Sequence, residues 1–414
     1  MQLLPFTLAA DATPELTGDL SLAQAIDAAL RRNPALAVSS YELKAADARV
    51  AQAKARPNPE ASLQLENFAG SGATRGVEAL ETTLALSQVI ELGGKRAYRV
   101  NAANFNRELS GIDRQAQQMD VLAEVTRRFI AVVLAQQAVT LADRATALTD
   151  QTHAAIKARV EAARSPQAEQ SRAAIARTRA RIEQQQAASA LQSARRALAA
   201  LWGARSASFT VATADLFALP EVQPFETLSA RLQNNPDFLR FATEERLREA
   251  EFRLAQARSK PDLNVSLGVR RFESTSDAAL VAGVSMALPL NRNQGGIREA
   301  EVRREQLRVQ SQTALLQAEA TLFGLYQEML SARMRVTTLR DDALPQAEAA
   351  LTQTQYGYER GRFSYLELTS AQQELLSLQS AAIDAAADYH RLVAEIERLT
   401  GEPITNDYLE APLP

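Results

Sequence analysis

The chain has 414 residues, a net charge of −3 at pH 7 and no cysteine. It can therefore form no disulfide, thiolate metal site or cysteine nucleophile, and its charge gives no reason to expect a nucleic-acid partner. At this length we expect two domains or one duplicated unit, and the low aromatic content of 5% is typical of closely packed helices.

Residues 1–19 include a short apolar run followed by small residues that suit cleavage. No positively charged segment leads this run, so we interpret 1–19 as an N-terminal arm or the remnant of an export signal. No stretch of about 18 apolar residues occurs anywhere, which excludes a transmembrane helix. Any membrane role must use strands.

The two halves of the chain repeat the same motifs in the same order. A short helix that ends at Asn-Pro occurs within 22–36 and again within 224–238. A proline-bounded strand, a Gly-Gly pair and two long helices follow each copy. We therefore predict duplication, with the boundaries as follows: a first repeat at 20–203, a linker at 204–223, a second repeat at 224–401 and a C-terminal tail at 402–414.

Apolar and polar residues alternate in two segments of each repeat, as in strands. The predicted strands are about 61–68, 79–91, 262–272 and 279–290. Each is near the length that a tilted strand needs to cross a bilayer. Four strands cannot close a barrel, so the chain must associate with copies of itself, two giving eight strands and three giving twelve. The alternative is a pair of soluble hairpins packed on the helices.

A Gly-Gly pair follows the second strand of each repeat. We expect Gly93 and Gly94, and likewise Gly295 and Gly296, to release the chain from the strand and turn it into a helix. The sequence GGK lacks the spacing and the hydroxyl residue of a phosphate-binding loop.

Long helices are predicted at about 95–163, 167–202, 297–356 and 364–400. The first would be on the order of 100 Å long. Heptad lines of apolar residues, including Leu322, Met329 and Val336, predict coiled-coil packing. A soluble coiled-coil scaffold would explain these helices, but it would not explain the strands.

The two histidines, His153 and His390, are isolated in the sequence. No spacing of His, Asp or Glu residues indicates a metal site or a catalytic group. We therefore expect no bound metal and no cofactor.

This order of motifs, with ELGGKR at 91–96 and GYERGRFSYLELTSAQQELL at 357–376, resembles the TolC-type outer-membrane efflux channels from about residue 20 to residue 401. ELGGKR is most similar to the CzcC-like heavy-metal efflux branch. The resemblance implies an α+β membrane protein in the bacterial outer membrane that extends into the periplasm. Three chains, with four strands each, would form a 12-stranded β-barrel in outer-membrane lipid, continued by a long α-helical coiled-coil tunnel.

The function implied is that of a passive exit channel, without enzymatic activity, in a tripartite, proton-driven efflux system. Its partners would be a periplasmic adaptor (membrane fusion protein) and an inner-membrane RND pump, and its cargo heavy-metal cations. Drug efflux or polypeptide secretion through the same channel is an alternative, and a soluble scaffold is a second one. Family members often carry a lipidated cysteine, which this chain lacks, so anchoring would depend on the barrel alone.

The helical hairpin ends of such a tunnel are free to meet partner hairpins end to end. The expected adaptor contacts at these ends are Arg164, Ser165, Gly361, Arg362 and Ser364. The alternative is that these residues only cap the turns.

TolC narrows its periplasmic entrance with two aspartates on the helix after the tip, and the matching residues here are Glu367 and Ser370. Three copies of Glu367 would form an acidic selectivity ring, because like charges in a narrow opening attract cations. Glu169, the repeat partner of Glu367, is expected to add to that field.

Overall fold

The computed structural model describes residues 16–221, 223–288 and 290–402. Most of the predicted N-terminal arm and all but the first residue of the predicted tail lie outside the described residues. The chain divides into two compact units, of which the first comprises Met1–Ala37, Ala116–Asn235 and Gln317–Pro414 and the second Val38–Gln115 and Pro236–Leu316. Each unit combines segments of both predicted repeats.

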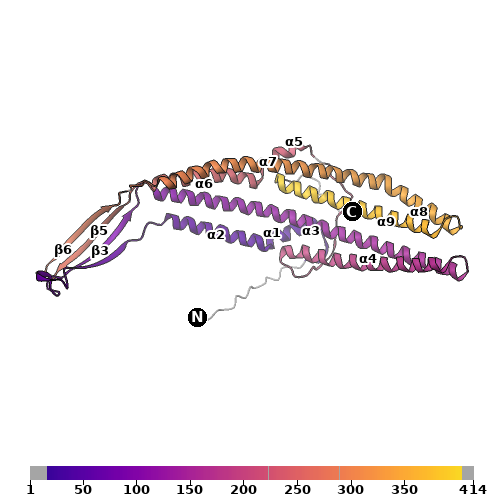
Figure 1. Ribbon diagram of the computed structural model, residues 1–414, viewed down its shortest axis with the longest axis horizontal. Helices are drawn as coiled ribbons and strands as arrows, with labels where there is room; N and C mark the ends of the chain where they lie inside the picture. Colours follow the sequence, from indigo (N-terminus) through magenta and orange to yellow (C-terminus); the bar gives the residue numbers. More distant parts are fainter. Residues whose placement is uncertain (1–15, 222, 289, 403–414) are drawn as a thin grey trace. The chain divides into compact units, whose positions relative to one another are not determined.

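The second unit contains a four-stranded antiparallel sheet (Figure 1). Its strands are β2 (Glu60–Glu66), β3 (Glu81–Ile90), β5 (Leu263–Phe272) and β6 (Ala278–Met286), in the order β2-β3-β5-β6. Each repeat supplies one hairpin, and the hairpins join along β3 and β5, from the pair Glu81 and Phe272 to the pair Ile90 and Leu263. The sheet is open, with β2 and β6 at its edges.

Strand β6 is shorter than the 279–290 that alternation predicts. It ends at Met286, which pairs with Leu263, the first residue of β5. Of the described residues, Leu288 and Leu290 continue the alternation, but they lie beyond the last pair of the β5–β6 ladder. Strand β2 likewise ends at Glu66, opposite the first residue of β3.

The register sorts side chains onto two faces, because successive residues of a strand point to opposite sides. What we call the polar face carries mostly small or polar side chains, although Val89, Phe272 and Val281 also lie on it, and the apolar face carries mostly large aliphatic ones. On the apolar face lie Leu63, Leu65, Leu84, Leu86, Ile90, Val265, Leu267, Val269, Leu280, Val284 and Met286, all exposed. On the polar face lie Ser62, Gln64, Thr83, Ala85, Ser87, Asn264, Ser266, Gly268 and Gly283.

Helices α2 (Pro34–Lys54), α3 (Lys95–Glu161), α6 (Pro236–Ala257) and α7 (Gln294–Thr338) connect to this sheet along the chain. Ala102, Leu247 and Ala250 form a small core in the second unit. Arg107 pairs with Asp47, and Arg246 donates to Glu108 at 2.5 Å. Among the helices of the described residues, none is long and apolar enough to cross a membrane.

The first unit is built mainly from helices: α1 (Leu22–Arg32), α4 (Gln167–Ala199), α5 (Phe225–Arg231), α8 (Leu344–Glu359) and α9 (Tyr365–Thr400), with parts of α3 and α7. A parallel pair of short strands, β1 (Gly18–Leu20) and β4 (Phe209–Ala212), accompanies them. Val125, Phe129, Leu198 and Trp202 belong to the main core. Leu322, Met329 and Val336 of the predicted seam are fully buried, as a coiled-coil seam requires.

The single helix predicted at 297–356 is instead two helices, α7 and α8, joined by a π-turn at Leu339–Ala343. Pro345 causes the widening, because a proline ring clashes with the carbonyl group four residues back and has no N–H to donate. The Leu344 N–H accordingly bonds to the Leu339 carbonyl, five residues back. Helices α8 and α9 run side by side in the first unit (Figure 1).

Candidate functional site

The first strand-to-helix junction is held by a bidentate ion pair. The Arg99 guanidinium donates to the Glu91 carboxylate at 2.5 and 3.0 Å and also to the carbonyl groups of Ala53 and Ala55, both at 3.1 Å. The hydrogen bond from Arg99 lowers the pKa of Glu91. Arg99 therefore ties the start of α3 to the end of α2 and the end of β3.

A second ion pair closes the same junction. Lys95 Nζ lies 2.7 Å from the Asp262 carboxylate, which also accepts a hydrogen bond from the Leu92 N–H at 3.0 Å. Gly93 and Gly94 have φ of +73° and +76°, a left-handed conformation that suits glycine. The predicted turn at Gly93 and Gly94 is present in the structure.

The second junction differs from the prediction. Gly295 and Gly296 lie in the first turn of α7, and the left-handed turn is made by Arg292, with φ of 41°, and Asn293, with φ of 51°. Asparagine tolerates this conformation because its short side chain can bond locally. In this structure the Asn293 Nδ2 donates instead to the carbonyl of Ala255 on α6, at 2.8 Å. The assignment of Gly295 and Gly296 as turn residues is therefore wrong.

The first helical tip lies between α3 and α4. Ala163 has φ of 54°, and the Arg164 N–H donates to the Arg159 carbonyl at 2.8 Å. The Arg164 side chain is exposed, whereas Ser165 is half-buried and its hydroxyl accepts from Arg159 Nε at 3.4 Å. Pro166, and not Ser165, is the N-cap of α4.

The second tip lies between α8 and α9. Gly361 has φ of +70°, and the Arg362 N–H donates to the Gly357 carbonyl at 2.8 Å. Ser364 is the N-cap of α9, so part of its role is to cap the turn. Gly361, Arg362 and Ser364 are all exposed. Among the described residues, neither Arg164 nor Arg362 forms an ion pair that would occupy its charge.

The structure brings the two tips together through one small core. Ile156, Ala173, Tyr358, Tyr365 and Leu368 come from α3, α4, α8 and α9 and pack against one another. The Arg159 guanidinium lies 4.8 Å from the centroid of the Tyr358 ring and donates to the Tyr358 carbonyl at 3.3 Å. The two hairpin ends therefore form a single contiguous cluster, which sequence analysis did not predict.

Glu367 forms a capping box with Ser364. Its carboxylate accepts from the Ser364 N–H at 2.7 Å and from the Ser364 hydroxyl at 2.8 Å, and the hydroxyl accepts from the Glu367 N–H at 3.3 Å. The hydrogen bond from the Ser364 backbone N–H is the largest cause of a lowered pKa of Glu367, and the bond from the Ser364 hydroxyl lowers it further. The carboxylate thus stays ionised while exposed at the start of α9.

The other two residues of the predicted entrance have different surroundings. Ser370 is exposed, one turn after Glu367. Glu169 is half-buried. Burial raises the pKa of the Tyr358 and Tyr365 hydroxyls, and the charge of Glu169 raises both further. In the described part of the chain, no hydrogen bond joins Glu169 to Glu367.

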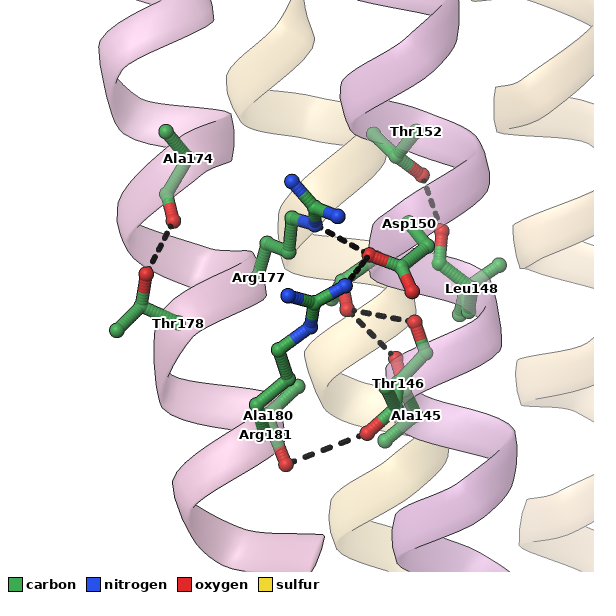
Figure 2. Close-up of polar contacts among 11 residues, drawn as sticks. Ala145, Thr146, Leu148, Asp150, Thr152, Ala174, Arg177, Thr178, Ala180 and Arg181 are labelled. Carbon is green, nitrogen blue, oxygen red and sulfur yellow. Dashed lines mark hydrogen bonds and ion pairs between the residues drawn. The ribbon is translucent and has the colours of Figure 1, made fainter.

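Polar contacts between α3 and α4 set how these two helices pair (Figure 2). The Asp150 carboxylate accepts hydrogen bonds from Arg177 and from Arg181, the latter at 3.4 Å, and the Thr146 hydroxyl donates to the Ala180 carbonyl at 3.3 Å. The hydrogen bond from Arg177 lowers the pKa of Asp150. Sequence analysis missed this group, since Asp150 and Arg177 lie on opposite sides of a tip.

The histidines take no part in a cluster of ligands. His390 is buried and its Nε2 lies 2.9 Å from the Leu216 carbonyl, and burial lowers its pKa. The neighbouring Tyr389 hydroxyl donates to the Pro220 carbonyl at 2.7 Å, so both side chains fasten the linker to α9. Among the described residues, no three His, Asp or Glu side chains are placed to hold a metal ion.

A family model and a characterised relative match nearly the whole chain. The family model described as "Outer membrane efflux protein" matches residues 25–204 and 227–402. The cobalt-zinc-cadmium resistance protein CzcC of Cupriavidus metallidurans is 30% identical over 388 residues, which cover 94% of this chain and 91% of that protein.

Two solved structures share the fold. A membrane protein from Pseudomonas aeruginosa superimposes with a TM-score of 0.80 at 20% sequence identity, covering 92% of both chains. CusC, described in connection with transmembrane channel formation, superimposes with a TM-score of 0.79 at 19% identity, again over 92% of both chains. Both structures support the fold over nearly the full length.

Proposed function

We propose, because this chain belongs to the outer membrane efflux protein family, that it is the passive exit channel of a tripartite, proton-driven efflux system. The chain is a protein of the outer membrane that extends into the periplasm. The observation that carries the proposal is a sheet with one face of exposed aliphatic side chains and an opposite face of mostly small or polar side chains, among them Glu60, Glu66, Glu81 and Arg270. Such a sheet suits a wall between lipid and water.

Assembly into a trimer follows from the edges of the sheet. Strands β2 and β6 each have one unpaired side, and unpaired backbone groups are not tolerated in hydrocarbon. Three chains would close twelve strands into one barrel. A line of exposed apolar residues at intervals of seven supports helix contacts between chains as well; it consists of Val302, Val309, Leu316, Phe323 and Leu330 on α7.

The purified protein should therefore be a trimer that requires detergent. Multi-angle light scattering, with the detergent mass subtracted, measures the number of chains directly. A monomer or a dimer would contradict the barrel of twelve strands. A monodisperse protein in detergent-free buffer would instead favour the soluble scaffold.

Divalent heavy-metal cations are the proposed cargo, delivered by an inner-membrane RND pump through a periplasmic adaptor. Support comes from a relative named for resistance to cobalt, zinc and cadmium, which matches 94% of the chain. The acidic residues of the four strands, Glu60, Glu66 and Glu81, all lie on the polar face, which would favour cations over anions. Deletion of the gene should lower resistance to cobalt, zinc and cadmium salts. Lowered resistance to drugs alone would assign the channel to drug efflux.

We further propose that Glu367 forms an acidic ring at the closed entrance, with a smaller contribution from Glu169. Glu367→Gln tests the charge alone, because glutamine also forms the capping box that holds the start of α9. The variant should show a weaker preference for cations and less block by multivalent cations in planar-bilayer recordings. If Glu367→Gln matches the wild type and Glu169→Gln does not, the ring belongs to Glu169.

A further inference from the structure

Charge gathers on the polar face where β2 ends and β3 begins. Glu66 and Glu81 are directly opposite each other in the ladder, an arrangement that destabilises a sheet when both side chains carry the same charge. Arg270 of β5 bridges them. Its Nη2 donates to Glu66 Oε2 at 3.0 Å, its Nη1 to Glu81 Oε2 at 2.8 Å and its Nε to the Thr83 hydroxyl at 2.9 Å.

Arg270 is the one basic residue on the polar face among the described residues of the four strands. Of the described residues in the four strands, only Arg270 and Arg271 are basic, and they point to opposite faces. Arg271 lies on the apolar face and pairs with Glu273 at 3.3 Å. The polar face thus carries one guanidinium among three carboxylates, those of Glu60, Glu66 and Glu81.

Without Arg270, the carboxylates of Glu66 and Glu81 would matter for a channel that conducts metal cations. Carboxylate oxygens on adjacent strands are suitable ligands for a divalent cation. Conduction requires that a site be weak enough for the ion to leave. A guanidinium held in a fork by three hydrogen bonds already occupies one oxygen of each carboxylate, and it cannot lose its charge by deprotonation.

We propose that Arg270 is a specificity-determining residue, an internal counter-cation that occupies Glu66 and Glu81 and so prevents the exit of the channel from retaining divalent cargo. The inference rests on the proposed function, since it takes the polar face as the lining of the lumen. Threefold symmetry would place three such clusters around one opening, each with a net charge of −1 from two carboxylates and one guanidinium.

The test removes the guanidinium and measures Cd²⁺ in two ways. In equilibrium dialysis of the detergent-purified protein, Arg270→Gln should bind up to about one additional Cd²⁺ per chain. In planar bilayers, the Cd²⁺ concentration that halves the conductance should fall at least about tenfold. Arg271→Gln, the neighbour on the apolar face, should match the wild type in both measurements, and Arg270→Lys should restore most of the wild-type behaviour.

The proposal is overturned if folded Arg270→Gln neither binds additional Cd²⁺ nor shows stronger block. It is also overturned if the additional Cd²⁺ persists when Glu66→Gln and Glu81→Gln are added. Should Arg270→Gln fail to assemble, the Glu66→Gln, Glu81→Gln double variant decides, because the remaining guanidinium should shift the permeability ratio towards anions and an unchanged ratio refutes the role. A wild-type protein that conducts nothing would refute the channel, whereas dialysis would still report on Arg270.

Discussion

Reversing both tip charges, with Arg164→Glu and Arg362→Glu in one chain, should abolish metal resistance and leave the yield of the trimer normal. Both side chains are exposed at the hairpin ends, and their backbone N–H groups already hold the turns, at 2.8 Å in each tip. The guanidinium groups are thus free to meet an adaptor. In the docked complex these contacts would be buried, and reversing a charge at a buried polar contact costs several kcal/mol of binding free energy, on the order of a thousandfold in affinity.

The measurement is the growth of gene-deleted cells, complemented with each variant, on cobalt, zinc and cadmium salts. Wild-type chain should restore resistance and the double variant should not, at equal amounts of trimer in the outer membrane. Arg179→Glu is the matched control, because Arg179 is exposed on α4 but lies beyond the tip. Full resistance with the tip variant, or an equal loss with the control, would remove the tips from the docking surface.

Gly268→Val should prevent assembly of the channel altogether. An added Cβ at Gly268 would lie 2.6 Å from the Leu84 carbonyl oxygen and 2.7 Å from the Ala85 Cβ. Both atoms belong to β3, whose pairing with β5 joins the two hairpins. Neither atom can move away without breaking that ladder. We therefore expect the free energy of unfolding to fall by about 3 kcal/mol or more, the upper range for overpacking.

Heat-stable trimer in outer-membrane fractions, measured by unboiled gel electrophoresis, reports this loss. Gly283→Ala provides a control on the same face, since its Cβ would meet only the Ser266 hydroxyl, at 2.6 Å, which can rotate. Gly324→Ala, on α7 with open space around it, should also leave the trimer intact. Trimer at the wild-type level for Gly268→Val would show that β3 and β5 are not packed as closely as the structure has them.

Much of this architecture is visible in the sequence because it depends on periodicity. Alternation located the strand segments, and heptads identified Leu322, Met329 and Val336, which are buried. The pairing of β3 with β5 was not predictable, because it joins residues nearly two hundred positions apart, such as Glu81 and Phe272. Strand ends also depend on the partner strand, which explains why Leu288 and Leu290 fall outside β6.

The candidate sites divide in the same way. The Ser-x-x-Glu spacing of Ser364 and Glu367 is a capping signal that can be read from the sequence, and the two residues form a capping box in the structure. The contacts of Arg270 with Glu66 and Glu81 required a register between strands of different repeats. Asp150 and Arg177 likewise meet only after the hairpin has folded. Local patterns in the sequence therefore reveal helix caps and heptad lines, whereas ion pairs between distant elements form only in the folded chain.

The two junctions make the same change from strand to helix with different residues. The first depends on two left-handed glycines and on Lys95 with Asp262, and the second on Asn293 bonded to Ala255. The repeated motifs indicate duplication, but the two copies of this junction have different partners in the structure. The two repeats are therefore not equivalent where strand meets helix, and a junction segment of one repeat would lack its contacts in the place of the other.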